Sequence, residues 1–438
     1  MNIIRKSLFL FSALLMLGFD YSLFAASVVE EKKPDIIFIL IDSLRSDHVG
    51  SYGYLRNTTP NIDKFAKEDC VRFETVIPGG SWTQPAVMTL FTSLSVDGHK
   101  RVLPNLSHNK DAVTLAEALR AAGYQTIGIT ANAMTHRKYG YGKGFDLWDD
   151  FSATLPPDVG IEKIASGYAR GALLTRMGLV KFARRDKSKP LFLFLFYMDP
   201  HWDYNPPPPY DRKFSSLSPQ RGAWQTPSSL VTEQLRQRVI DAYDGEIAYC
   251  DKAISDLLES LRKSSRWEDT IVVIAGDHGE SFWERGFSGH GNDLYDSELK
   301  VPLFIRVPKA RRGDISPGSV VKGQVGGIDV APTILDLASI DIPKSWRGKS
   351  LRSEMLSGRS EGRVLLTETR IRAQLWQRAV RTDRWKVISI GDFSKPSQVY
   401  DLELDPEEKI NLAKSSAALP VDVGGLMSLL RPEKEGAR

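Results

Sequence analysis

Runs of apolar residues recur along the chain, and each is short enough to form one β-strand. They are rich in Ile, Val, Leu and Phe and mostly lack alternation with polar residues, which is typical of strands buried on both faces of a sheet. We predict strands at residues 35–41, 125–130, 191–197, 270–275 and 301–306.

Between these runs, apolar residues recur every three to four positions, the period of an amphipathic helix. We predict helices near residues 59–66, 112–122, 231–261 and 329–338, and a further helix that begins close to Thr83. Strands that alternate with helices form mostly parallel sheets with helices on both faces. The sequence therefore predicts an α/β fold, a three-layer α/β/α sandwich with a mostly parallel central sheet.

Other parts of the chain lack this regular pattern. Pro, Gly and Ser become frequent over residues 151–182 and 204–226, which we interpret as loops over one edge of the sheet. From about residue 352 the chain is more polar, with strand-like runs at 363–368 and 385–390. We expect a small C-terminal subdomain there, with a loosely ordered tail after Ala413.

The N-terminus has the pattern of a targeting segment. Arg5 and Lys6 precede an apolar run from Leu8 to Phe19, and the stretch 23–27 that follows ends in the small residues Ala-Ala-Ser. This predicts a signal peptide cut near Ala25 or Ala26 and a periplasmic or secreted protein; an uncleaved membrane anchor is the alternative, and only then do we expect membrane contact. We divide the chain into a signal peptide at 1–26, a large α/β domain at 34–350 and the C-terminal subdomain at 351–438.

Composition narrows the classes of partner. Charged residues make up 26 % of the chain, hydrophobic residues 42 %, and the net charge is +4 with the signs mixed. We therefore expect no nucleic-acid partner, whereas anionic substrates are compatible with this balance. The only cysteines are Cys70 and Cys250. Export would permit a disulfide, two buried thiols are the alternative, and their spacing matches no metal site.

Thr83 places a hydroxyl where a loop becomes a helix. Gly79 and Gly80 precede it, and Pro85 has a fixed φ and no N–H, so it fits the first helical turn. The N-terminus of a helix offers N–H donors to a phosphate or sulfate oxygen. Thr83 is therefore a candidate nucleophile, and the alternative is that it only caps the helix.

Three further polar residues follow predicted strands: Asp42, Asp277 and His278. Residues beyond the carboxyl ends of parallel strands can converge. Together with the Thr83 hydroxyl, they could bind one divalent ion such as Zn²⁺, Mn²⁺, Mg²⁺ or Ca²⁺. Such an ion would lower the pKa of the hydroxyl and neutralise charge on the ester oxygens.

Two more histidines lie in loops after predicted strands. His201 follows the strand at 191–197, and His290 lies in a glycine-rich loop after His278. Both are candidates to bind substrate oxygens or to protonate a leaving group.

An ordered series of motifs resembles the sulfatase family within the alkaline phosphatase superfamily. The series runs through Ile41–His48, Tyr52–Tyr54, Thr59–Asp63, Thr83–Pro85, Asp199–His201, Gly276–Glu280 and Val301–Leu303, and continues in the C-terminal part with Arg381–Lys386, Tyr400–Leu402 and Asp405–Leu412. The resemblance covers nearly the whole mature chain. It implies the family's closing antiparallel sheet in the C-terminal subdomain, and it puts Asp42, Thr83, Asp277 and His278 on the family's metal and nucleophile positions.

The sequence departs from the family pattern at several of these positions. Classical sulfatases carry a cysteine, matured to formylglycine, in a Cys-x-Pro-x-Arg signature, where this chain has Thr83 and Val87. Ser43 replaces the usual second aspartate, and the family's Lys and His have no clear counterpart between Ile127 and His136. The remaining Asp, Thr, Asp and His resemble the single-metal site of phosphate-ester hydrolases and phosphoethanolamine- or phosphoglycerol-type transferases.

Three functions agree with these observations. The first is an exported metal-dependent hydrolase of sulfate or phosphate esters, on a small molecule or a glycan, with Thr83 as nucleophile. The second is a transferase of a phosphoryl-linked head group, and the third a non-catalytic binder of anionic glycans. Because a threonine ester cannot collapse to an aldehyde as formylglycine does, the threonine favours phosphorus over sulfur as the reacting atom.

Overall fold

The computed structural model describes residues 32–101, 109–150, 170–220, 222–370, 375–414 and 423–431. The predicted signal segment and most of the loop expected at 151–182 lie outside these ranges. The chain from Pro34 onward forms one compact unit. Within the ranges described, no helix is both long enough and apolar enough to cross a membrane.

The core of this unit is an eight-stranded sheet in the order β10-β2-β9-β6-β1-β5-β3-β4. β9 runs antiparallel to β2 and β6, and the other pairings are parallel, as predicted. The strands are β1 (Asp35–Ile41), β2 (Cys70–Ile77), β3 (Gln125–Thr130), β4 (Leu147–Asp149), β5 (Leu191–Tyr197), β6 (Thr270–Gly276), β9 (Leu303–Arg306) and β10 (Val320–Gly326). β1, β5 and β6 are buried along their whole length because both faces of the sheet are covered.

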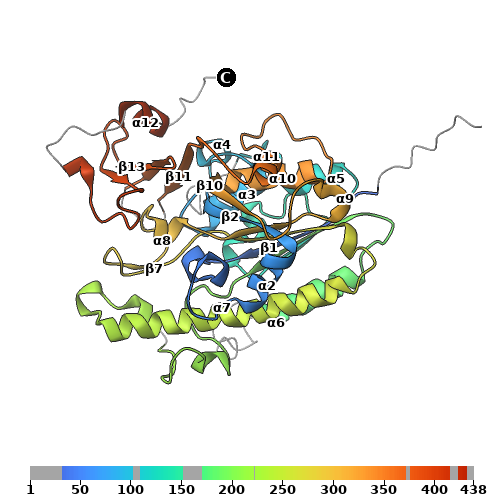
Figure 1. Ribbon diagram of the computed structural model, residues 1–438, viewed down its shortest axis with the longest axis horizontal. Helices are drawn as coiled ribbons and strands as arrows, with labels where there is room; N and C mark the ends of the chain where they lie inside the picture. Colours follow the sequence, from blue (N-terminus) through green and yellow to red (C-terminus); the bar gives the residue numbers. More distant parts are fainter. Residues whose placement is uncertain are drawn as a thin grey trace, which may run out of the picture. The chain divides into compact units, whose positions relative to one another are not determined.

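Helices cover both faces of this sheet (Figure 1). One face carries α2 (Pro60–Asp69), α6 (Gly171–Ala183) and the long α7 (Glu233–Arg262); the other carries α3 (Thr83–Thr92), α5 (Leu115–Ala121), α10 (Val330–Leu337) and α11 (Arg352–Ser357). Short helices α4 (Val96–His99), α8 (Asp296–Leu299) and α9 (Lys309–Arg312), and a hairpin of β7 (Ser281–Phe282) and β8 (Ser288–Gly289), complete the large part. The predicted three-layer sandwich is confirmed.

A second, antiparallel sheet in the order β11-β12-β13-β14 lies in the C-terminal part. Its strands are β11 (Leu365–Thr369), β12 (Gln377–Arg381), β13 (Trp385–Ile390) and β14 (Gln398–Asp401). The backbone of Glu368 in β11 pairs with Gly79 and Gly80, in the loop before Thr83. The small sheet therefore supports the loop that carries the candidate nucleophile.

Two segments differ from the sequence prediction. Residues 171–182, expected in a loop, lie in α6, where Gly178 lets the helix approach Leu195 of β5 so closely that a Cβ there would lie 3.1 Å from its side chain. The expected loose tail after Ala413 contains helix α12 (Val423–Leu430), which buries Met427 and Leu430 against the small sheet. In both cases tertiary packing supplies a stabilisation that the local pattern does not display.

Cys70 and Cys250 are free and buried. The alternative of two buried thiols is therefore the one that the structure supports, and burial raises the pKa of both thiols.

Strands β2 and β10 were not predicted, because their sequences mix polar residues and glycine with apolar ones.

Candidate active site

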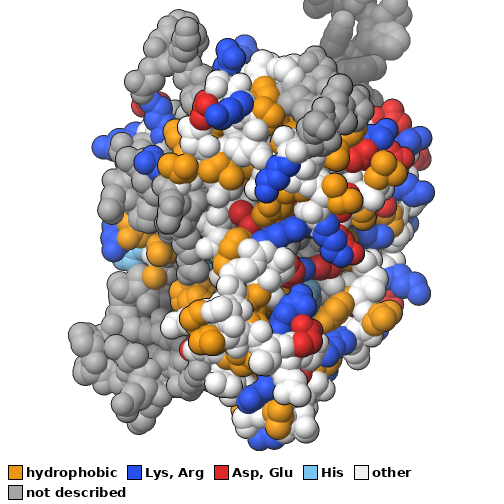
Figure 2. Space-filling view, turned by 90° about the vertical axis from the view of Figure 1, so that its left-hand side faces the viewer, with side chains coloured by type: hydrophobic (Ala, Val, Ile, Leu, Met, Phe, Trp, Pro, Cys, Tyr) orange, Lys and Arg blue, Asp and Glu red, His pale blue; other side chains and the backbone are white. Residues whose placement is uncertain are grey.

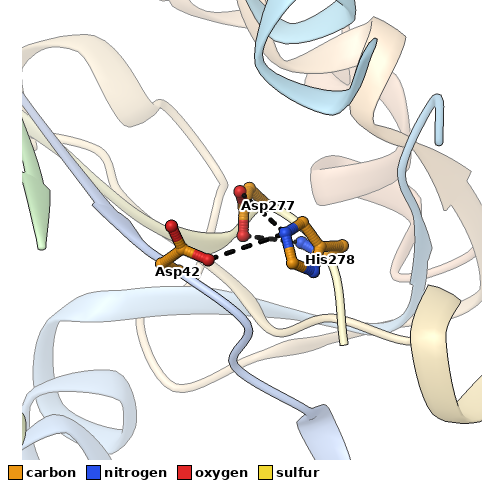
Figure 3. Close-up of side chains that lie close together, drawn as sticks. All are labelled: Asp42, Asp277 and His278. Atoms are coloured by element: carbon orange, nitrogen blue, oxygen red, sulfur yellow. Dashed lines mark hydrogen bonds and ion pairs between the residues drawn. The ribbon is translucent and has the colours of Figure 1, made fainter. Parts of the chain in front are cut away.

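Asp42, Asp277 and His278 lie side by side because the strands before them are neighbours in the sheet. β1 and β6 pair in parallel with Ile41 opposite Gly276, so the next residue of each chain segment leaves the sheet at the same edge. The carboxylates of both aspartates point toward the His278 imidazole (Figure 3). One ligand atom from each of the three lies within 4.8 Å of the others, so the predicted convergence holds.

Thr83 is the first residue of α3 and reaches the same point from the other side. The N-cap position belongs to Trp82, so the Thr83 side chain does not cap the helix. Its Oγ1 lies 3.4 Å from His278 Nε2. The preceding loop packs tightly, since a Cβ on Gly80 would lie 2.6 Å from Pro85 Cγ and 2.8 Å from the Glu368 carbonyl oxygen. Glycine at that position therefore lets the small sheet and the helix meet.

Asp277 and His278 each use one polar atom for a hydrogen bond and turn the other toward a common point. Asp277 Oδ1 accepts from the backbone N–H groups of Ser43 (3.0 Å) and His278 (2.8 Å), whereas its buried Oδ2 accepts no hydrogen bond. His278 Nδ1 donates to the Gly279 carbonyl oxygen at 2.9 Å. That bond leaves the Nε2 lone pair 3.4 Å from Asp277 Oδ2 and 3.5 Å from Asp42 Oδ1.

These atoms fit a divalent cation. Burial raises the pKa of Asp42 well above its usual range, and the nearby charge of Asp277 raises it further. Burial also raises the pKa of Asp277 to about 8. Two fully buried carboxylates side by side resist ionisation until a cation balances them, and a buried carboxylate oxygen without a hydrogen-bond donor next to an imidazole lone pair is a suitable ligand set.

His290 and His201 lie beside this cluster, as a second group. The His290 ring centroid is 4.3 Å from that of His278 and 5.0 Å from that of His201. His290 Nδ1 donates to the buried Glu280 carboxylate at 3.0 Å, which fixes its ring. Burial, followed by the neighbouring His290, lowers the pKa of His201 to about 3. His201 is therefore neutral at pH 7.

Asn132 is a site residue that sequence reasoning missed. It follows β3, and its Nδ2 donates to Asp42 Oδ2 at 2.5 Å and to Thr83 Oγ1 at 3.2 Å. Its position after a predicted strand was the available signal. Glu280 ends the Gly276–Glu280 motif but was not predicted as a site residue, although its carboxylate orients His290.

A separate cleft of about 870 Å³ lies near the start of α7 and α8, on the side that Figure 2 presents. Side chains of both signs line it, and they pair with one another: Arg45, for example, binds Asp47 and Glu284. Arg45 also donates to the Glu280 carbonyl oxygen at 2.9 Å, which ties the cleft wall to the loop of the candidate site.

The position and chemistry of these side chains indicate the class of protein. A hydroxyl, an imidazole and two acidic side chains at the carboxyl edge of a parallel α/β sheet are the components of a metal-assisted ester hydrolase. The comparisons with known proteins give the family. Residues 34–340 match the Sulfatase family model, and residues 290–424 match the model of N-sulphoglucosamine sulphohydrolase, C-terminal. The chain therefore belongs to the sulfatase family and is an ester hydrolase.

Similarity to other proteins of the family extends over most of the chain. An arylsulfatase of Clostridium perfringens is 25 % identical over 87 % of this chain and 91 % of that protein. A choline-sulfatase of Rhizobium meliloti is 26 % identical over 89 % of this chain and 84 % of that protein. A multifunctional alkaline phosphatase superfamily protein of Trinickia caryophylli is 23 % identical over 88 % of this chain and 92 % of that protein.

Solved structures share the fold. The phosphonate monoester hydrolase of Agrobacterium radiobacter superposes with a TM-score of 0.74 at 19 % identity, covering 91 % of this chain and 95 % of that one. A protein in complex with its substrate D-glucosamine-2-N,6-O-disulfate superposes with a TM-score of 0.73 at 19 % identity, covering 91 % and 97 %.

Proposed function

We propose that this protein is an exported, metal-dependent hydrolase that cleaves phosphate or sulfate esters through a covalent intermediate on Thr83. The observation that carries the proposal is the position of Thr83 Oγ1, 3.4 Å from His278 Nε2, beside Asp42 and Asp277 and at the N-terminus of a ten-residue helix. A nucleophilic hydroxyl needs neighbours of this kind to activate it, whereas a hydroxyl that only caps a helix does not.

The reaction has two balanced steps. In the first, Thr83 Oγ1 loses its proton and attacks the central phosphorus or sulfur; the bond to Oγ1 forms, the ester bond breaks, and the leaving oxygen takes up a proton. In the second, water attacks the central atom, the bond to Oγ1 breaks, and Thr83 regains a proton. The first N–H groups of α3 have no intrahelical partner and can bind a non-bridging oxygen in both steps.

His290 serves the leaving oxygen in this scheme. Glu280 holds His290 by its Nδ1, so that the ring keeps one orientation beside His278. This fixed orientation suits a ring that transfers a proton to the leaving oxygen. His201 is neutral at pH 7 and its Nδ1–H donates to the Trp202 carbonyl oxygen, so its Nε2 can accept a hydrogen bond from water or a substrate hydroxyl but cannot donate to the ester oxygens.

The residues that would hold the cation are Asp42, Asp277, His278 and Thr83. When bound, the cation would neutralise charge on the ester oxygens and lower the pKa of the Thr83 hydroxyl. Because one ligand is an imidazole nitrogen, the set favours Zn²⁺ or Mn²⁺ over Ca²⁺, which prefers six or more oxygen ligands.

We infer that phosphate and phosphonate esters are turned over better than sulfate esters. A threonine ester has no route to an aldehyde, so water must attack its central atom, and this is the step that a sulfothreonine makes difficult. The phosphonate monoester hydrolase among the similar structures and the multifunctional relative agree with phosphorus chemistry on this fold. Another similar protein binds a sulfated sugar as its substrate. Anionic glycans are therefore the natural substrate class to assay beside the phosphate and phosphonate esters.

Export is part of the same proposal. A cleaved signal segment is supported by Arg5 and Lys6, by the apolar run that follows and by the small residues at 25–27. Fractionation of the producing cells and N-terminal sequencing of the mature protein test it. A start at Met1 in the cytoplasmic fraction would contradict export.

Replacement of Thr83 tests the nucleophile. We expect Thr83→Ala to lower kcat at least about a thousandfold, and acid-quenched wild-type protein to carry a phosphoryl group on Thr83. Thr92→Ala is the control and should retain kcat, because the Thr92 hydroxyl lies on the same helix but donates to the Met88 carbonyl oxygen of that helix. Aryl phosphate, phosphonate, phosphodiester and sulfate are assayed side by side with Zn²⁺ or Mn²⁺. Unchanged turnover in Thr83→Ala would refute the assignment.

A further inference from the structure

Hydrogen bonds within its own loop fix the backbone and the side-chain oxygen of Asn132. Its backbone N–H donates to Thr130 Oγ1 at 3.0 Å, and its carbonyl oxygen accepts from Thr135 Oγ1 at 2.8 Å. Its side-chain Oδ1 accepts from the backbone N–H of Met134 at 2.7 Å, where it caps a short 3-10 helix. Because Oδ1 is thereby fixed, the amide cannot flip, and the Nδ2 group faces the candidate site.

Both N–H groups of that amide are used inside the site. One donates to Asp42 Oδ2 and the other to Thr83 Oγ1, in surroundings where Asn132 is 98 % buried. Asp42 is thus held at two points, since the Ser43 hydroxyl donates to its Oδ1 at 2.9 Å. With its second oxygen bound to the amide, Asp42 keeps Oδ1 on the side of His278.

We propose that Asn132 is a positioning residue that fixes the Asp42 carboxylate as a metal ligand and the Thr83 hydroxyl as a nucleophile with one amide group. This proposal rests on the proposed function of Thr83. The amide N–H takes one lone pair of Oγ1, so the hydroxyl proton must point away from Asn132. The same N–H stabilises the negative charge that grows on Oγ1 when the proton leaves.

The neutrality of the amide is part of this role. The ionised forms of Asp42 and Asp277 together carry the charge that one divalent cation balances. A cationic donor at residue 132 would compete with that cation, and a carboxylate would repel Asp42. An amide donates two hydrogen bonds without changing this balance.

Asn132→Ser tests the proposal with little change to the fold, because serine also caps helices but lacks both amide N–H groups. We expect kcat to fall about ten- to a hundredfold while KM stays within about threefold, the loss typical of a hydrogen bond to a charged group. Titration calorimetry of the metal-free protein with Mn²⁺ should show an affinity about tenfold weaker. Asn132→Ala, which removes the cap as well, should repeat both losses with a lower Tm.

Asn61 offers a matched control. Its Nδ2 donates to the buried Asp251 Oδ2 at 2.6 Å, between α2 and α7 and away from the site. Asn61→Ser should lower Tm and leave kcat and Mn²⁺ affinity unchanged. The positioning role is overturned if Asn132→Ser keeps kcat within threefold at saturating Mn²⁺, or if Asn61→Ser loses as much kcat.

The calorimetric readout separates this inference from the proposed function. If the wild-type protein hydrolyses none of the esters, the proposed function fails, and the Mn²⁺ titration still decides whether Asn132 holds Asp42. An unchanged Mn²⁺ affinity in Asn132→Ser would overturn that hold, whatever the activity.

Discussion

Asp277 provides the sharpest test of a site built around a cation. We predict that Asp277→Asn makes the metal-free protein more stable, although it weakens metal binding. The asparagine Oδ1 can keep the two backbone hydrogen bonds of Asp277 Oδ1, and its Nδ2 would lie near the His278 Nε2 lone pair. In the wild type, the buried Oδ2 of Asp277 accepts no hydrogen bond. In the variant, the Nδ2–H group that replaces it would have the His278 Nε2 lone pair as an acceptor.

The magnitude follows from the raised pKa. Burial raises the pKa of Asp277 from 3.8 to about 8, so the folded protein binds more protons than the unfolded chain between these values. This contribution to stability is complete below about pH 4 and is lost as the pH rises toward about 8. At about 1.4 kcal/mol per pKa unit, the metal-free wild type loses roughly 3 kcal/mol by pH 6 and roughly 5 kcal/mol by pH 8. Asparagine does not ionise and avoids this loss.

Thermal unfolding in a chelator measures the difference. For a chain of 438 residues, roughly 5 kcal/mol corresponds to a Tm about 5 °C higher for Asp277→Asn at pH 8, narrowing toward zero near pH 4. Mn²⁺ at a thousandfold excess over its Kd should stabilise the wild type by about 4 kcal/mol and the variant much less. A chelated variant that melts below the wild type at pH 8 would refute the reasoning.

Two further predictions concern side chains around the site and in the core. Glu280→Gln removes the charge that orients His290 and should lower kcat about ten- to a hundredfold with little change in Mn²⁺ affinity; a pH–rate profile identical to that of the wild type would contradict the role. Cys70 and Cys250 are buried thiols of raised pKa, so iodoacetamide should label neither in native buffer and both after denaturation. Mass spectrometry reads the result, and rapid native labelling would show that the burial is wrong.

Much of the architecture could be predicted from local pattern. β1, β3 and β5 have the predicted bounds, and β6 differs by one residue. β1, β5 and β6 are central and buried along their whole length, so burial on both faces imposes continuous apolar sequence on them. β2 and β10 lie toward one edge of the sheet, where polar residues are tolerated and the pattern weakens. Helix α6 escaped prediction because its two glycines serve packing rather than propensity.

Local sequence pattern was sufficient to predict which residues follow the central strands and which hydroxyl lies where a helix begins after a glycine pair. That information was enough to bring Asp42, Asp277, His278 and Thr83 into one hypothesis, because parallel strands deliver their next residues to a common edge.

How these side chains are used depends on contacts between distant parts of the folded chain. The tertiary structure places the Asn132 amide between Asp42 and Thr83, and it leaves one oxygen of Asp277 without a hydrogen-bond donor. The physical reason is that a side chain's hydrogen-bond partners depend on backbone segments far away in sequence, 90 residues apart for Asn132 and Asp42. Local periodicity records burial, whereas the direction of each polar atom is fixed when those segments pack together.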